Sequence, residues 1–232
     1  MYFKLKNIAI FSILLTIISF FFTGCASVNL TAPPTDILTE LSSGTIIIES
    51  GADSTLDCTP SLTVSCEGAT YMSFSGDGAS WTDWITYNSS YDGFNISNKS
   101  YGTIFGSGTK IVYAKFKNEE GVTSPLDDLA YATIYYNMPE LRYFEVSPKK
   151  ATIKLNGEAS FTAIGWSEGK EYEVPIDGDK VTWTHCCGVG IVKPTQGLST
   201  IYTPVGISSP CTKYITAYYE GKQASAEIVI TE

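Results

Sequence analysis

Short runs in which apolar and polar residues alternate recur along most of this 232-residue chain. Clusters of Gly, Ser, Asn, Asp and Pro separate them, and no window beyond the N-terminus keeps the 3.6-residue period of an amphipathic helix. Seven of these runs are SLTVSC, TYMSFS, KIVYAKFK, ASFTAI, VTWT, KYITAYY and SAEIVIT. Several such runs at regular spacing predict an all-β sandwich or barrel, and the missing helices exclude parallel βα units.

The first 25 residues have the pattern of an export signal. Lys4 and Lys6 precede an uncharged apolar run over 8–22, which is short for a spanning helix and suits a signal-peptide core. The run ends in FTGC, which resembles the lipobox of bacterial lipoprotein signal peptides, with Phe22 where that pattern usually has Leu. The resemblance implies cleavage after Gly24, a lipid such as palmitate on Cys25, and an exported lipoprotein anchored at the bacterial envelope. The alternative is a plain N-terminal anchor helix.

A tether and a strong acidic excess follow the signal. Residues 27–44, SVNLTAPPTDILTELSSG, are polar and contain prolines, so we expect 25–44 to form a flexible lipidated tether after the signal peptide, 1–24. Without residues 1–24 the chain has 13 basic and 24 acidic residues, a net charge of −11. This acidity and the absence of a Lys/Arg cluster argue against a nucleic-acid partner.

The β pattern is interrupted at Asn137-Met138-Pro139. Each side has about 95 residues, close to the size of an immunoglobulin-like (Ig-like) sandwich. Residues 45–137 hold 11 acidic and 4 basic side chains, whereas 138–232 hold 11 and 9. We therefore expect two tandem β-sandwiches, 45–137 and 138–232, after the signal peptide and the tether.

The first half carries a specific motif. MSFSGDGASWTDW, followed later by GSGTKIVYAKFKNEEGVTS, resembles a repeat of bacterial surface proteins with an Ig-like or fibronectin-III-like fold, over most of 68–124. An insertion around SNKSYGTIF departs from that repeat. The residues fit a hairpin without the resemblance, because Asp77-Gly78 can form a tight turn. In the later strand, one face is expected to be apolar and the other to carry the lysines; these residues are Val112, Ala114, Phe116, Lys115 and Lys117.

The second half resembles another family. VSPKKATIKLNGEASFTAIG, VTWTHCCGVGIV and YITAYYEGKQASAEIVIT are similar to the bacterial Ig-like group 2 family, over nearly all of 141–232. The Cys-Cys pair after Trp183 and a third cysteine depart from that family. Strand alternation places Phe161 with Ala163 on one face, and we expect Trp183 in the core. The same alternation groups Ile215, Ala217 and Tyr219.

Trp81 and Trp84 raise a question of geometry. Residues three apart point to opposite faces of a continuous strand unless a bulge intervenes. The piece SGDGASW is also close to the Asp-box hairpin of sialidase propellers, in which the Trp packs over its own turn. We interpret Trp81 as hairpin packing and Trp84 as a core or half-exposed edge residue. Exposed Trp84 and Trp166 are the candidate ligand contacts.

The residues that carry chemistry form no convincing site. His185, Cys186 and Cys187 are consecutive, so they cannot all point one way on a strand, and no zinc-type Cys spacing is present. No Asp-x-Asp-x-Asp-Gly calcium loop, Gly-x-Ser-x-Gly motif or phosphate loop occurs. We predict no catalytic residue, metal ligand or cofactor, and weak calcium binding at a sandwich end stays open.

Five cysteines remain beside Cys25, so at least one has no partner within the chain. Cys58 and Cys66 flank Pro60, and we expect a disulfide between them. In the second half, strand alternation favours Cys187–Cys211 and leaves Cys186 over, with Cys186–Cys211 as the alternative.

Three functions remain. The Ig-like resemblance implies a non-catalytic surface lipoprotein that spaces, adheres, or binds a protein or cell-envelope polysaccharide, with the membrane as partner through its lipid. The alternative is a carbohydrate-binding module that uses exposed Trp and Tyr side chains, including those of YATIYY. The third is an enzyme or redox protein that uses His185, Cys186 and Cys187.

Overall fold

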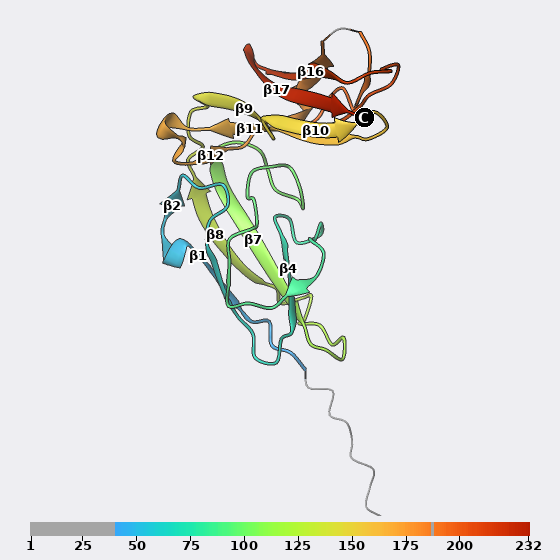
Figure 1. The fold of residues 1–232 in the computed structure, drawn as a ribbon. Helices are drawn as coiled ribbons and strands as arrows, with labels where there is room; N and C mark the ends of the chain where they lie inside the picture. The colour runs from blue at the N-terminus through green and yellow to red at the C-terminus, as the bar shows by residue number, and fades with distance from the viewer. Residues whose placement is uncertain (1–39, 187) are drawn as a thin grey trace, which may run out of the picture. The chain divides into compact units, whose positions relative to one another are not determined.

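The structure is a computed structural model that describes residues 40–186 and 188–232. The predicted signal peptide, the lipidation residue Cys25, most of the tether and Cys187 lie outside these residues. The described part belongs to one compact unit of the chain, and its regular secondary structure is almost entirely β-strand (Figure 1). The prediction of an all-β protein with two sandwiches is confirmed.

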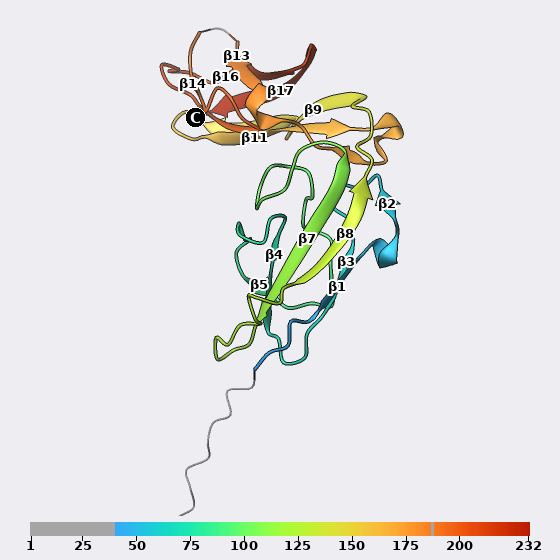
Figure 2. The ribbon, with the colours of Figure 1, turned by 180° about the vertical axis from the view of Figure 1, so that it is seen from behind.

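The first sandwich consists of a three-stranded sheet, in the order β1-β3-β6, and a five-stranded sheet, in the order β2-β8-β7-β4-β5. Figures 1 and 2 show β4, β7 and β8 running side by side. The strands are β1 (Thr45–Ile48), β2 (Ser54–Thr55), β3 (Leu62–Ser65), β4 (Tyr71–Ser75), β5 (Ile85–Thr86), β6 (Ser90–Tyr91), β7 (Gly108–Lys117) and β8 (Ala130–Tyr136).

The core of the first sandwich follows from strand alternation. Every second residue of β7 is buried, and Val112, Ala114 and Phe116 are fully covered, as the sequence predicts. They pack with Phe74 of β4 and Tyr136 of β8 in one hydrophobic cluster. The cluster also includes Leu41, and Met138 packs against it. Both residues lie just outside the predicted bounds 45–137, so the first core uses the end of the predicted tether.

The second sandwich has a five-stranded sheet, in the order β12-β11-β15-β14 with β9 also paired to β11, and a four-stranded sheet, in the order β10-β17-β16-β13. The strands are β9 (Tyr143–Ser147), β10 (Lys150–Lys154), β11 (Ala159–Trp166), β12 (Glu173–Val174), β13 (Thr182–His185), β14 (Ile191–Lys193), β15 (Ser199–Thr203), β16 (Cys211–Tyr219) and β17 (Lys222–Thr231).

The second core is separate from the first and confirms the predicted faces. Phe161 and Ala163 of β11 are buried together, as are Ile215, Ala217 and Tyr219 of β16. Trp183 of β13 is 2% exposed, and its indole nitrogen donates a hydrogen bond to the carbonyl oxygen of Gly197 at 2.7 Å. The expected core role of this tryptophan is therefore confirmed.

Helical structure in the described residues is limited to three 3₁₀ turns. They are η1 (Glu49–Gly51), η2 (Glu168–Lys170) and η3 (Gly178–Lys180). Among residues 40–186 and 188–232, no helix is long and apolar enough to cross a membrane.

Candidate binding surface on the first sandwich

The Asp77 turn connects β4 to the segment that carries Trp81 and Trp84. The Asp77 carboxylate accepts hydrogen bonds from the backbone nitrogens of Ala79 and Ser80 at 2.8 and 2.7 Å, and from the Ser75 hydroxyl at 2.9 Å. These donors hold the pKa of Asp77 well below its ordinary value. Gly78 has a φ of +72°, a conformation that glycine adopts without strain. The predicted Asp77-Gly78 turn is therefore present.

A bulge follows this turn and sets the direction of the two tryptophans. Met72 of β4 pairs with Ile85 of β5, yet the carbonyl oxygen of Phe74 accepts a hydrogen bond from the Thr82 nitrogen at 3.0 Å. Two residues of the edge segment, Asp83 and Trp84, thus lie opposite the single residue 73. The extra residue breaks the strict alternation of the strand. Trp81 and Trp84 consequently point to the same side, which a continuous strand would not allow.

On that side the two tryptophans alternate with lysines. The Lys115 ammonium lies 4.3 Å from the ring centroid of Trp81 and 4.9 Å from that of Trp84. The Lys117 ammonium lies 4.7 Å from the Trp84 centroid and 4.9 Å from the Tyr71 centroid. We call these five residues the ladder. Because the lysines occupy faces of the rings, the tryptophans are packed rather than offered as a bare platform for a sugar.

The ladder continues into a longer aromatic surface on β7 and β8. Tyr113 faces Tyr131 across the two strands, with ring centroids 5.8 Å apart. Tyr131 is 64% exposed, Tyr135 46% and Ile111 38%. We use "outer face" for the ladder together with Ile111, Tyr113, Tyr131, Thr133 and Tyr135. Within the described residues, β4, β7 and β8 contain no Asp or Glu, although the chain has 24 of them.

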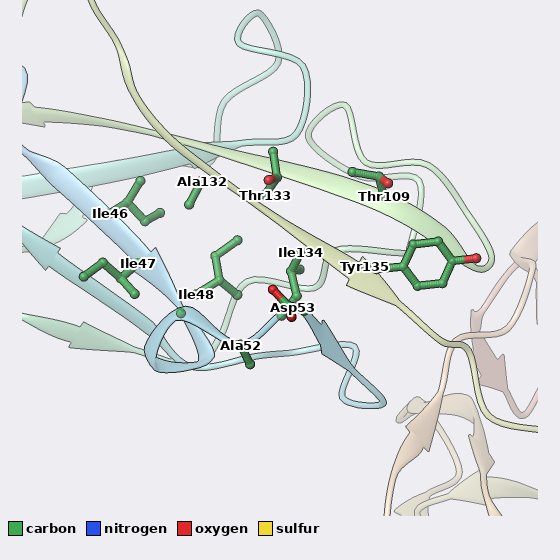
Figure 3. A pocket seen from close by; sticks show the side chains of 11 residues that line it. Ile46, Ile47, Ile48, Ala52, Asp53, Thr109, Ala132, Thr133, Ile134 and Tyr135 are labelled. Carbon is green, nitrogen blue, oxygen red and sulfur yellow. The ribbon is translucent and has the colours of Figure 1, made fainter.

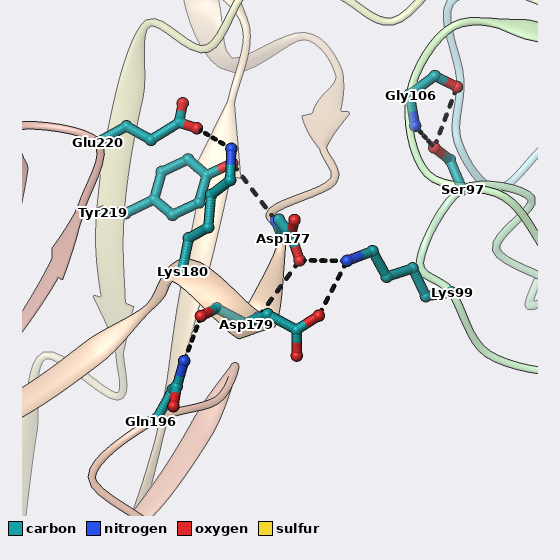
Figure 4. A network of polar contacts seen from close by, with 9 residues as sticks. All are labelled: Ser97, Lys99, Gly106, Asp177, Asp179, Lys180, Gln196, Tyr219 and Glu220. Atoms are coloured by element: carbon teal, nitrogen blue, oxygen red, sulfur yellow. Dashed lines mark hydrogen bonds and ion pairs between the residues drawn. The ribbon is translucent and has the colours of Figure 1, made fainter.

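Five other lysines of the described chain form ion pairs with carboxylates, whereas the two ladder lysines do not. Lys99 pairs with Asp177 at 2.6 Å and with Asp179 at 3.0 Å, in a polar network beside η3 (Figure 4). In that network these carboxylates raise the pKa of Lys99, and Lys99 in turn lowers the pKa of Asp177. Lysines 149, 150, 170 and 180 also pair with glutamates.

Lys115 and Lys117, by contrast, form no ion pair with a residue of the described ranges. Partial burial under the rings lowers the pKa of Lys115. Two positive charges are therefore held against aromatic rings in a strongly acidic chain.

A groove of about 400 Å³ lies beside the outer face, between β1 and β8. Figure 3 shows Ile46 and Ile48 of β1 near Ala132 and Ile134 of β8 at this groove. It forms because β2 pairs only with the last two residues of β8. The groove has a mixed lining, in which Asp53, Thr133 and Tyr135 accompany the isoleucines.

The other predicted contact, Trp166, lies elsewhere. It ends β11 in the second sandwich, pairs with Tyr143 of β9 and Glu173 of β12, and is half-buried. The structure does not bring it into the ladder. The sequence did not predict that Lys115 and Lys117 pack against the tryptophan rings. The alternation identified in β7 nevertheless placed both lysines on the outer side.

The predicted Cys58–Cys66 disulfide is wrong, because both residues are free thiols in the structure. The Cys58 thiol donates to the carbonyl oxygen of Glu173 and accepts from the Asn95 side chain, whereas the Cys66 thiol contacts Ser42. Strand β3 runs between the two cysteines and extends the chain, at about 3.3 Å per residue. The two thiols accordingly contact different parts of the chain rather than each other.

The second group of cysteines is only partly described. Cys211 is a free thiol, and Cys187 lies outside the described residues, so the Cys187–Cys211 bond stays a prediction. Cys186, expected to be left over, is also free, and its sulfur accepts a hydrogen bond from the Tyr214 nitrogen at 3.2 Å. Over 40–186 and 188–232, no group of three His, Cys, Asp or Glu side chains is arranged to hold a metal ion.

Comparison with known proteins identifies no family. No family model matches the chain, and no curated protein matches it. Among solved structures, domains 4 and 5 of the S-layer protein SbsC are similar over 83% of this chain and all of that one, at 15% identity and a TM-score of 0.33. A longer SbsC structure matches at 14% identity and a TM-score of 0.32, and the match spans 28% of its length.

The four N-terminal Ig domains of Dscam1 isoform 1.9 match 77% of this chain and 43% of their own, at 15% identity and a TM-score of 0.28. These scores assign the chain neither a family nor a function.

Proposed function

We propose that this chain is a non-catalytic, lipid-anchored Ig-like protein of the bacterial cell surface, and that it binds another component of the cell envelope. The outer face of the first sandwich is the binding surface in this proposal. The anchoring part rests on the N-terminal sequence, in which an apolar run ends in FTGC. The binding part rests on the geometry of β7 and β8.

The observation that carries the proposal is the exposure of large side chains from regular strands. Tyr131 and Tyr135 extend from β8 and Ile111 from β7, each more than a third exposed. Contiguous apolar surface of this kind commonly marks a place where a soluble domain meets a partner. Tyrosine suits such a role, because it buries a large ring while its hydroxyl still forms hydrogen bonds.

Binding is tested with the soluble chain, residues 26–232, and cell envelopes isolated from its source. The triple variant I111S/Y131S/Y135S removes the exposed part of the outer face. The matched control is Y214S/Y218S on β16, where the two tyrosines are 51% and 41% exposed. We expect the soluble chain and the control to co-sediment with envelopes and the triple variant to lose most of its binding. Thermal melts verify that all three are folded.

Equal co-sedimentation of the triple variant and the control, or none by the unaltered chain, would refute the binding part. The anchoring part is tested with Cys25→Ala in the full-length chain. This change should abolish partition of the processed protein into a detergent phase, since two or more acyl chains hold a protein firmly on a membrane. A fully processed variant that stays in the membrane fraction would show that the anchor is not the lipid on Cys25.

A further inference from the structure

The lysines of the ladder are unusual within the first sandwich. Residues 45–137 contain 11 acidic side chains and four lysines. Lys99 is neutralised by Asp177 and Asp179, and Lys110 is 5% exposed and donates to the carbonyl oxygen of Ile104. Lys115 and Lys117 therefore supply the accessible positive charge that no carboxylate of the described residues compensates.

The rings position these charges without using their hydrogen-bonding capacity. An ammonium group has three N–H donors, and an aromatic face attracts the charge but offers no lone pair. Within residues 40–186 and 188–232, no hydrogen bond from the side-chain nitrogens of Lys115 or Lys117 accompanies the ring contacts. Contact with the rings on both sides also restricts these flexible side chains before any ligand arrives, which lowers the entropic cost of binding. Both ammonium groups are thus positioned to donate hydrogen bonds to an anionic group of a ligand.

The distribution of acidic residues around the ladder limits the type of anionic ligand that the outer face can bind. The acid-free strip follows β4, β7 and β8, and acidic residues stand in the turns beside it. These flanking residues are Asp77, Asp83, Glu119, Glu120, Asp127 and Asp128, and Asp53 lines the groove beside Thr133 and Tyr135. A narrow polymer can lie along the strip and avoid them, whereas a membrane surface or a broad acidic protein would meet them and be repelled. The strip itself offers tyrosine rings and the Thr133 hydroxyl, which suit the C–H faces and hydroxyl groups of sugars.

We propose that the outer face binds a linear acidic polysaccharide of the cell envelope, with Lys115 and Lys117 contacting its anionic groups. This inference rests on the proposed function, since the anchor keeps the face near the envelope. The 16 residues from Cys25 to Glu40, which precede Leu41 of the first core, span at most about 58 Å when fully extended. The tether therefore confines the first sandwich to the zone in which envelope polymers are attached.

The test uses polygalacturonate as a linear acidic polysaccharide and its fully methyl-esterified form as the matched neutral polymer. Tryptophan fluorescence reports binding, because Trp81 and Trp84 contact the lysines directly. We expect polygalacturonate to change the fluorescence saturably, with an affinity that falls as salt rises. The esterified polymer should bind at least about tenfold more weakly, because it lacks the charge-assisted contacts.

Variants separate specific contacts from general attraction. K115M/K117M keeps the apolar stems against the rings and should lower the affinity for polygalacturonate at least about tenfold. K115R/K117R keeps both the charge and the ring contacts and should retain binding. The control K193M/K222M changes two exposed lysines of the second sandwich and should have no effect. Loss of affinity in the control equal to that in K115M/K117M would overturn the proposal.

Four further outcomes are decisive. Poly-glutamate that binds as tightly as polygalacturonate would show an acidic polypeptide site instead, and the polysaccharide proposal would fail. If envelopes bind the chain but K115M/K117M binds them normally and polygalacturonate does not compete, this inference fails while the proposed function stands. If the unaltered chain does not bind envelopes at all, the binding part of the proposed function is refuted. Competition by polygalacturonate together with loss in K115M/K117M supports both.

Discussion

The ammonium nitrogen of Lys115 lies 4.3 Å from the centre of the Trp81 ring, on the outer side of the first sandwich. The contact exists because a bulge at Asp83 and Trp84 turns the tryptophan segment over β7. It joins the two parts of the motif, the SGDGASWTDW hairpin and the KIVYAKFK strand, which are far apart in sequence. The packing of the hairpin and the position of the Lys115 charge on the outer face therefore depend on the same contact.

The first prediction concerns this pair. W81A should lower the free energy of unfolding by about 1–3 kcal/mol, since it removes a large packed ring, and K115M by about 0.5–1 kcal/mol. The double variant W81A/K115M should lose less than the sum, with a coupling of about 0.5–1 kcal/mol. Urea unfolding at low salt measures all four proteins. Additive losses would show that the ring and the ammonium do not interact.

The second prediction concerns pH. The pKa of Asp77 is lowered in the folded protein, mainly by the backbone nitrogens of Ser80 and Ala79. The ionised carboxylate therefore adds stability above its ordinary pKa of 3.8, and this is lost as pH falls through the folded pKa. The difference in melting temperature between the unaltered chain and D77N should be largest above about pH 4 and shrink below it. A difference independent of pH would contradict the ionised form of this turn.

The third prediction concerns thiol reactivity. Burial raises the pKa of Cys58 to about 12 and raises that of Cys66, so both thiolates are scarce in the folded protein. A thiol reagent should label half-exposed Cys186 quickly, and Cys58 and Cys66 only after denaturation. Peptide mapping without prior reduction identifies the labelled positions. Recovery of a Cys58–Cys66 disulfide would contradict the structure.

The strand pattern of the chain was predictable because strand alternation is a local property. It identified the buried faces of β7, β11 and β16 and the core role of Trp183. The ladder was not predictable, since one extra residue between Thr82 and Ile85 decides where Trp84 points, and a bulge leaves little mark in sequence. The cysteine pairing failed for a related reason. The two cysteines are close in sequence and flank Pro60, which suggested that the chain reverses its direction between them. Instead, the extended strand β3 lies between Cys58 and Cys66.

The fourth prediction concerns the division into domains. The two hydrophobic clusters share no residue, so fragments 40–138 and 139–232 should each fold and melt cooperatively. Leu41 is 4% exposed in the first cluster, so a fragment that begins at residue 45 should be about 2–3 kcal/mol less stable than one that begins at 40. Circular dichroism melts measure both effects. A first fragment that is unfolded alone, or is insensitive to the loss of Leu41, would contradict the division.

The most direct test of the outer face is chemical footprinting of tyrosines without any substitution. Tyr131 on the outer face and Tyr214 on β16 are similarly accessible in the free chain, at 64% and 51% exposed. The soluble chain is nitrated with tetranitromethane, free and after it has bound isolated envelopes, and the modified tyrosines are quantified by peptide mass spectrometry. Our account predicts that bound envelopes protect Tyr131 several-fold and leave Tyr214 unchanged. Equal modification of Tyr131 in the free and bound chain, or protection of Tyr214 alone, would contradict it.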